Sequence, residues 1–198
     1  MGPAAIDLDL HIKDVQALLE SEGLERVILV GHAYAGMVMT GVAEVCAQRL
    51  AHLVYVNGVV PRDGEAMVDQ LDVVRGPDFT ARVRAAIDNR EDFLLPPTTA
   101  EEIQRRWAID DLKDQSWVLP RLCPQPVASF AQPIRLLSSQ AQGIPRSFIL
   151  SSESGFAPVA ERARRCGWGV YQLATGHDPM ITKPREVTEI LLKIAGND

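Results

Sequence analysis

Residues 27–43 read as a hydrophobic strand, a tight glycine turn and a helix, an arrangement that can present a catalytic serine. The turn, GHAYAG at residues 31–36, has the layout of G-x-S-x-G. In that motif the serine sits at the top of a strained strand-to-helix turn and its hydroxyl projects into a pocket. The third position of this turn is Ala33, which has no hydroxyl. A covalent acyl intermediate at this position is therefore excluded.

Three blocks of the sequence resemble the α/β-hydrolase superfamily, in the branch of small esterases, plant methyl-ester esterases and hydroxynitrile lyases. The blocks are VILVGHAYAGMVMTGVAE (27–44), LVYVNGVVPRDGEAM (53–67) and ATGHDPMITKPREVTEILLKIA (174–195). Weaker similarity covers IDLDLHIKDVQALLE (6–20) and SFILSSESGFAP (147–158). Because the blocks occur in the family's order, the resemblance implies the family's fold.

The resemblance also implies positions for a histidine base and for the acid that orients it. His177, in ATGHDPM, matches the family's histidine, and we expect it to face the pocket. Ser154 aligns with the family's aspartate, while Glu153 either substitutes for that aspartate or is a solvated loop carboxylate. Some relatives use a carboxylate at the end of the preceding strand, where this chain has Asn57. Without a carboxylate partner, His177 should be a weak base with a pKa near its ordinary value.

Half of the family's oxyanion hole is expected to remain. The backbone N–H of Tyr34, at the start of the helix, can donate to an anion or a carbonyl oxygen. The other donor comes in the family from a loop before the first helix, and this sequence begins after that region. We expect the side chains of His32 and Tyr34 to pack around the turn.

Alternating strand and helix patterns predict an α/β fold: a three-layer sandwich with a parallel sheet and a helical cap. Residues 1–61 and 146–198 should form the core and residues 62–145 the cap. The aromatic residues of the cap should either line an apolar pocket or, more commonly, pack on the core; they are Phe93, Trp107, Trp117 and Phe130. The predicted strands are 26–30, 53–57, 147–152 and 168–174; the predicted helices are 7–23, 34–50, 158–166 and 183–195, with helical pieces near 80–90 and 100–113. Thr182 is the predicted N-cap of the last helix.

The first predicted strand lacks the neighbour that the family places beside it, so the expected fold is a truncated one. Residues 26–30 would then form an apolar sheet edge, which favours pairing with another chain. We expect a homo-oligomer joined through this edge. The alternative is a truncated gene start with a poorly soluble product.

Length, charge and cysteine content limit the number of domains, the kinds of partner and the location that we expect. The chain has 198 residues, enough for one domain, and a net charge of −6 without a basic run, which argues against nucleic acid as a partner. No apolar stretch reaches about 18 residues, and the N-terminus lacks a secretory pattern, so no membrane contact is expected. The three cysteines have no metal-ligand spacing, which favours a reduced, cytoplasmic protein. No metal or cofactor motif is visible, so the expected partner is a small molecule.

Ala33 has two explanations, deliberate replacement of a serine or natural loss. Natural loss also explains why Ser154 and Asn57 stand at positions where relatives have a carboxylate, and why the family's front strands are missing. The favoured function is a non-hydrolytic enzyme, of lyase or cyclase type, in which His177 moves a proton on a small metabolite. The alternatives are an esterase, thioesterase or acyl transferase inactivated at Ala33, and a non-catalytic binding or scaffold protein.

Overall fold

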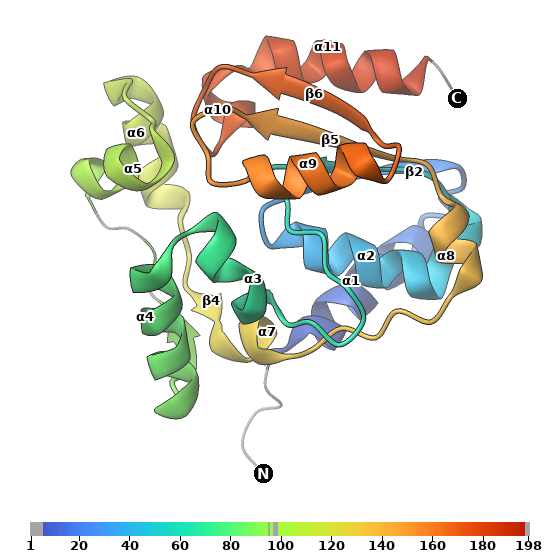
Figure 1. Cartoon of the computed structure of the whole chain (residues 1–198), viewed down its shortest axis with the longest axis horizontal. Coiled ribbons are helices and arrows are strands. Elements are labelled where there is room, and N and C mark those ends of the chain that lie inside the picture. The colour runs from blue at the N-terminus through green and yellow to red at the C-terminus, as the bar shows by residue number, and fades with distance from the viewer. Residues whose placement is uncertain (1–5, 95, 97–98, 197–198) are drawn as a thin grey trace.

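A parallel four-stranded sheet in the order β1-β2-β5-β6 forms the centre of the molecule (Figure 1). The computed structural model describes residues 6–94, 96 and 99–196. The sheet strands are β1 (Val27–His32), β2 (Leu50–Val56), β5 (Arg146–Ser151) and β6 (Gly169–Leu173), and a separate antiparallel pair joins β3 (Phe93–Leu94) to β4 (Gln125–Pro126). The helices are α1 (Leu8–Ser21), α2 (Ala35–Cys46), α3 (Met67–Val74), α4 (Pro77–Asp88), α5 (Ala100–Trp107), α6 (Leu112–Val118), α7 (Val127–Ala131), α8 (Ser139–Gly143), α9 (Ala157–Arg165), α10 (Pro179–Thr182) and α11 (Pro184–Ala195), with 3-10 turns at Ala47–Arg49 and Leu119–Arg121.

Helices cover both faces of the sheet, because successive strand residues point to opposite sides. Leu53 and Tyr55 of β2 belong to the main core, with residues of α1, α2 and α9. Val54 and Val56 face the other side, where they join Ile194 of α11 in a second cluster. Figure 1 shows α11 on one side of the strands and α2 and α9 on the other. The predicted three-layer arrangement with a parallel sheet is confirmed.

Most of the predicted core elements are present with small shifts at their ends. The first helix is capped by Asp7, whose carboxylate accepts a hydrogen bond from the N–H of Leu10 at 2.9 Å. The prediction that Thr182 caps the last helix is wrong. The N-cap is Lys183, and Thr182 ends α10, with its hydroxyl 2.5 Å from that of Thr175.

Strand β1 lies at the edge of the sheet, as its sequence predicted. Within the described residues it pairs only with β2. Val30 of this strand is 43% exposed, although it is a strongly apolar residue. Whether another chain covers this edge remains a prediction. Across the described residues, no helix is both long and apolar enough to cross a lipid bilayer.

The segment between β2 and β5 contains more helix than its sequence pattern indicated. Helix α3 was not predicted, and the expected helical piece near 100–113 is two short helices, α5 and α6. These two helices enclose a small cluster of their own around Ile103, Ile109 and Val118. Helices α7 and α8, by contrast, contact α1 and α2 of the core. The division into core and cap at residues 61 and 146 stays a prediction.

Candidate functional site

The turn after β1 keeps a strained backbone, although the residue at its apex is alanine. Ala33 has φ +50°, in the left-handed region, which costs a residue with a side chain about 1–2 kcal/mol. The N–H of Ala33 donates to the carbonyl of Val56 at 3.2 Å, and its carbonyl accepts from the N–H of Val59 at 3.1 Å. A Cβ on Gly36 would collide with the backbone of Val59, so this position needs glycine. The turn is therefore fixed by β2 and the loop that follows it.

His177 lies in the loop between β6 and α10, at the same carboxyl edge of the sheet. Its N–H donates to the carbonyl of Trp107 at 3.0 Å, and Gly176 permits this approach because a Cβ there would collide with the same carbonyl. The imidazole stacks on Phe156, with ring centroids 5.4 Å apart and planes 13° apart. It also lies against His32, the residue before Ala33, at a centroid distance of 4.6 Å. The ring is thus held beside the turn by packing.

No carboxylate of the described residues forms a hydrogen bond or ion pair with the His177 imidazole. Its Nδ1 is buried and makes no hydrogen bond within the described residues, and the whole residue is only 8% exposed. Burial, with smaller contributions from His32 and Arg75, lowers the pKa of His177 well below its ordinary value. The expectation of a near-ordinary pKa is therefore wrong, because the sequence did not reveal how deeply the ring is buried. At neutral pH this imidazole is uncharged.

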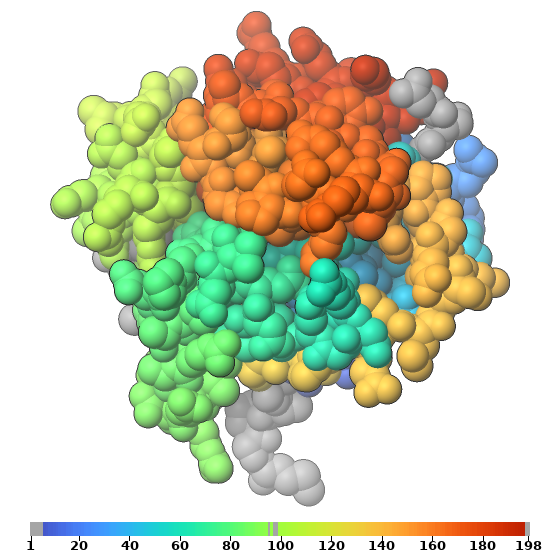
Figure 2. Space-filling model, viewed as in Figure 1, coloured from blue at the N-terminus to red at the C-terminus, as the bar shows by residue number. Residues whose placement is uncertain are grey.

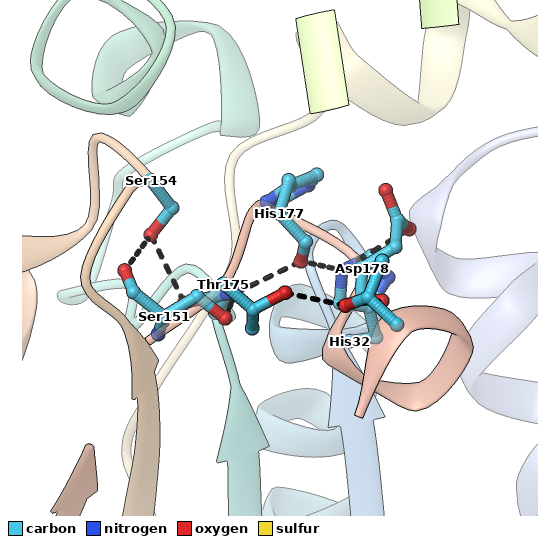
Figure 3. Close-up of polar contacts among 8 residues, drawn as sticks. His32, Ser151, Ser154, Thr175, His177 and Asp178 are labelled. Atoms are coloured by element: carbon cyan, nitrogen blue, oxygen red, sulfur yellow. Dashed lines mark hydrogen bonds and ion pairs between the residues drawn. The ribbon is translucent and has the colours of Figure 1, made fainter. Parts of the chain in front are cut away.

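The two residues considered for the acid role lie in the loop after β5. The Ser154 hydroxyl donates to the carbonyl of Ser151 at 2.7 Å and to Oδ1 of Asn57 at 3.1 Å. Figure 3 shows this hydroxyl turned toward Ser151 and away from the His177 ring. Glu153 is exposed, and its N–H donates to the carbonyl of Thr175 at 3.2 Å. Neither residue forms a hydrogen bond with His177 in the described part of the chain.

Asn57, at the end of β2, binds the backbone of the histidine loop and not its ring. Its side chain is fully buried, and its amide nitrogen donates to the carbonyl of His177 at 2.8 Å and to Oγ of Ser151 at 2.7 Å. Its Oδ1 accepts from the N–H of Ser151 at 2.8 Å and from the hydroxyl of Ser154. Asn57 has φ +40°, a conformation that asparagine tolerates better than most residues. Asn57 therefore positions the loop after β5 and the loop that contains His177 at the carboxyl edge of the sheet.

His32 and Tyr34, on either side of Ala33, make structural contacts. His32 Nε2 lies 3.0 Å from the carbonyl of His177, which can only accept, so this nitrogen carries the proton. The same nitrogen is 3.7 Å from Oδ1 of Asp178, and Figure 3 shows the group. Burial lowers the pKa of His32 and raises that of Asp178. The Tyr34 hydroxyl is 2.8 Å from Nδ1 of His11. Burial raises the pKa of the Tyr34 hydroxyl to about 12.

A cleft of about 730 Å³ opens next to His177. Its walls come from α3 and the start of α4, from the end of α5, and from the loop at residues 153–155. These segments, coloured green, yellow-green and orange, meet on the face shown in Figure 2. His177, Glu153 and Ser154 line the cleft, whereas Ala33 is not among the described residues that do. The imidazole of His177 is thus part of the cleft wall, while Ala33, which is partly exposed, lies outside that wall.

The wall of the cleft has charged side chains beside apolar ones. Four arginines line it, and the aromatic residue there is Phe79; sequence reasoning identified none of the five. Phe130 is buried against Tyr34, and Trp117 and Phe93 are half exposed elsewhere, so packing and surface positions account for these predicted aromatics. Among the described residues, no group of three or more His, Cys, Asp or Glu is arranged to hold a metal ion.

Comparison with known proteins identifies the family of this chain. The alpha/beta hydrolase family model matches residues 2–190. The carbendazim hydrolyzing esterase of Nocardioides sp. (strain SG-4G) is 33% identical over 194 residues, which cover 94% of this chain and 78% of that protein. Putative methylesterase 13 of Arabidopsis thaliana is 24% identical, over 86% of this chain and 41% of that protein.

Solved structures show the same fold. An extracellular alpha/beta-hydrolase from a Paenibacillus species superimposes with a TM-score of 0.79 at 17% identity, over 97% of this chain and 81% of that chain. Tomato methylketone synthase I has a TM-score of 0.64 at 18% identity, over 87% and 71% of the two chains. The chain therefore belongs to the alpha/beta hydrolase family.

Proposed function

We propose that this protein binds a small carbonyl-containing metabolite in the cleft and that its chemistry there is proton transfer by His177, without a covalent intermediate on residue 33. The observation that carries this proposal is the composition of the cleft wall, which includes His177 but not Ala33. The reaction is then of lyase or cyclase type, in which a substrate rearranges or fragments once a proton has moved. A substrate that reacts readily when oriented needs few catalytic groups.

The state of His177 supports the role of proton acceptor. Its lowered pKa keeps the imidazole neutral, and so able to accept a proton, at neutral pH and below. The flanking rings of Phe156 and His32 restrict its orientation. Asn57 and His32 hold its backbone through the carbonyl oxygen. The chain thus fixes a base of modest strength beside an accessible cleft.

Ring opening of 5-nitrobenzisoxazole tests this function without knowledge of the natural substrate. A base removes the proton on carbon, the N–O bond breaks, and a cyanophenolate forms whose absorbance is measured. We expect catalysis above the rate in buffer, and a loss of about 100-fold in His177→Ala, the lower end of what a positioned base contributes. His11→Ala, an imidazole outside the cleft, serves as the control. Unchanged turnover in His177→Ala would rule out the assignment.

The second candidate is an ester-cleaving activity, of the esterase, thioesterase or acyl transferase type, disabled at Ala33 alone. Two observations favour it: the turn keeps its strained geometry at φ +50°, and the relative at 33% identity is an esterase. The test is Ala33→Ser assayed with p-nitrophenyl acetate and an acyl thioester. Turnover that needs both the introduced serine hydroxyl and His177 would support this candidate. Continued inactivity would leave it without support.

We also propose that β1 is covered in solution by a second copy of the chain. The support is the position of β1 at the edge of the described sheet and the 43% exposure of Val30. An apolar edge with unpaired N–H and C=O groups favours strand pairing.

A further inference from the structure

Arg75 and Arg106 approach the same aromatic ring in the cleft. Arg75 follows α3, and its guanidinium carbon lies 5.4 Å from the centroid of Phe79. Arg106, near the end of α5, lies 5.5 Å from the same centroid. The ring attracts each cation, by about 0.5–1 kcal/mol at a site open to water, but it does not neutralise their charge. Two guanidinium groups are thus brought to one place in the wall of the cleft.

The positive charge of Arg75 is not balanced by an ion pair. In the part of the chain that the structure describes, no carboxylate lies within salt-bridge distance of Arg75. Burial, and then repulsion by Arg106, lowers the pKa of Arg75, and Asp178 offsets only part of this. A half-buried cation next to a like charge is stabilised when an anion binds.

Charged side chains of both signs line the cleft. They are the guanidinium groups of Arg75, Arg82, Arg105 and Arg106 and the carboxylates of Asp72, Asp78 and Glu153. Asp72, Asp78 and Glu153 are exposed, so solvent screens their charge, whereas Arg75 and Arg106 are half-buried. Asp178 and Glu102 offset the charges of these two arginines only in part, because the pKa of each guanidinium is still lowered.

We propose that the cleft is a binding site for a small organic anion, whose carboxylate or phosphate is received by Arg75 and Arg106 while its body lies toward Phe79 and His177. This inference rests on the proposed function and names the substrate class for it. Guanidinium groups bind planar carboxylate and phosphate oxygens through paired N–H donors. Because the two arginines and His177 line one cleft, binding of the anionic group to the arginines places the rest of the ligand next to the imidazole.

The test is calorimetric titration of the full-length chain at low ionic strength with benzoate, phenyl phosphate and benzamide. We expect at least one of the two anions to bind, the neutral amide to bind at least tenfold more weakly, and added salt to weaken anion binding. The anion that binds with the higher affinity shows whether the site prefers a carboxylate or a phosphate. Arg75→Gln should lose about tenfold or more in anion affinity, since a charge-assisted hydrogen bond is lost. Arg84→Gln, on α4 but outside this cleft, is the matched control.

Three results would overturn the proposal: benzamide binding as tightly as the anions, equal losses in Arg75→Gln and Arg84→Gln, or no binding of either anion. Circular dichroism checks that each variant folds. If Arg75→Gln does not fold, Arg106→Gln, the other guanidinium group of the proposed site, replaces it with the same expected weakening. These binding measurements require no turnover. If the natural chain binds the anions but does not accelerate the ring opening of 5-nitrobenzisoxazole, only the proposed proton transfer is defeated.

Discussion

The side-chain amide of Asn57 donates a 2.8 Å hydrogen bond to the backbone carbonyl of His177, 120 positions away in the chain. Asn57 directly follows β2, a strand in the middle of the sheet, whereas His177 lies in the loop after the edge strand β6. The same amide also reaches Ser151 at the end of β5. One buried side chain therefore fixes the position of the imidazole relative to two other strands.

The amide of Asn57 should be difficult to replace even by a residue of the same size. In Asn57→Asp the carbonyl of His177 loses its donor and faces a carboxylate oxygen. We expect the free energy of unfolding to fall by about 1–3 kcal/mol, the cost of leaving a buried polar group unsatisfied. Urea denaturation measures it. Asn89→Asp, on an exposed helix end, is the control and should change stability little; equal losses in both variants would contradict the role given to Asn57.

Stability should depend on pH through the buried imidazoles. The pKa of His177 and that of His32 are lowered in the folded state, so the unfolded chain binds protons more readily. The free energy of unfolding should therefore fall as pH drops through about 6.5, by at most about 1.4 kcal/mol per pH unit for each imidazole. The raised pKa of Asp178 has the opposite sign and acts at lower pH.

Replacing the titrating group tests this pH dependence. His177→Gln should show a smaller loss of stability between pH 7 and pH 5 than the natural chain, and adding His32→Gln should reduce the loss further. Thermal unfolding followed at several pH values measures it. An unchanged slope in His177→Gln would show that the buried ring does not carry the effect.

A carboxylate at residue 154 should provide His177 with a charged neighbour. Both residues line the cleft, and Nδ1 of His177 is buried without a hydrogen-bond partner among the described residues. In Ser154→Asp we expect the pKa of His177 to rise, because a nearby negative charge favours the protonated ring. Proton NMR titration of the imidazole measures the change. Ser154→Asn has the same size without the charge, and an equal rise in both variants would refute the electrostatic reason.

The exposed position of β1 at the sheet edge predicts that two copies of the chain form a dimer. If a second copy covers this strand, the natural chain should sediment as a dimer, and Val30→Lys should sediment as a monomer because a charged side chain on an edge opposes strand pairing. Val45→Lys changes a similarly exposed valine on α2 and should stay dimeric. Sedimentation velocity measures the mass. A monomeric natural chain at micromolar concentration would end the proposal.

The elements around the sheet could be predicted from sequence because local signals mark them. The valine-rich strand before the glycine turn, the Asp7 cap and Gly23 after α1 each act within a few residues. The position of His177 near the turn also follows from parallel topology, since the carboxyl ends of all four sheet strands meet at one edge. These relationships need no knowledge of distant contacts.

The cleft could not be predicted in the same way. Arg75 and Arg106 are 31 positions apart in the sequence. They come together because both guanidinium groups approach Phe79 of α4, a contact that no local pattern encodes. The low pKa of His177 likewise results from burial by Phe156 and neighbouring loops, which no local pattern encodes. Helix α3, which forms part of the wall, lies in the region where the sequence periodicity weakens.

Pre-steady-state mixing of Ala33→Ser with p-nitrophenyl acetate tests most directly whether residue 33 lies outside the reach of a bound ligand. We expect no burst of p-nitrophenolate and no acetylated protein by mass spectrometry, because His177 but not residue 33 is among the described residues that line the cleft. A burst equal to the enzyme concentration, abolished by His177→Ala, would contradict it and restore the ester-cleaving interpretation.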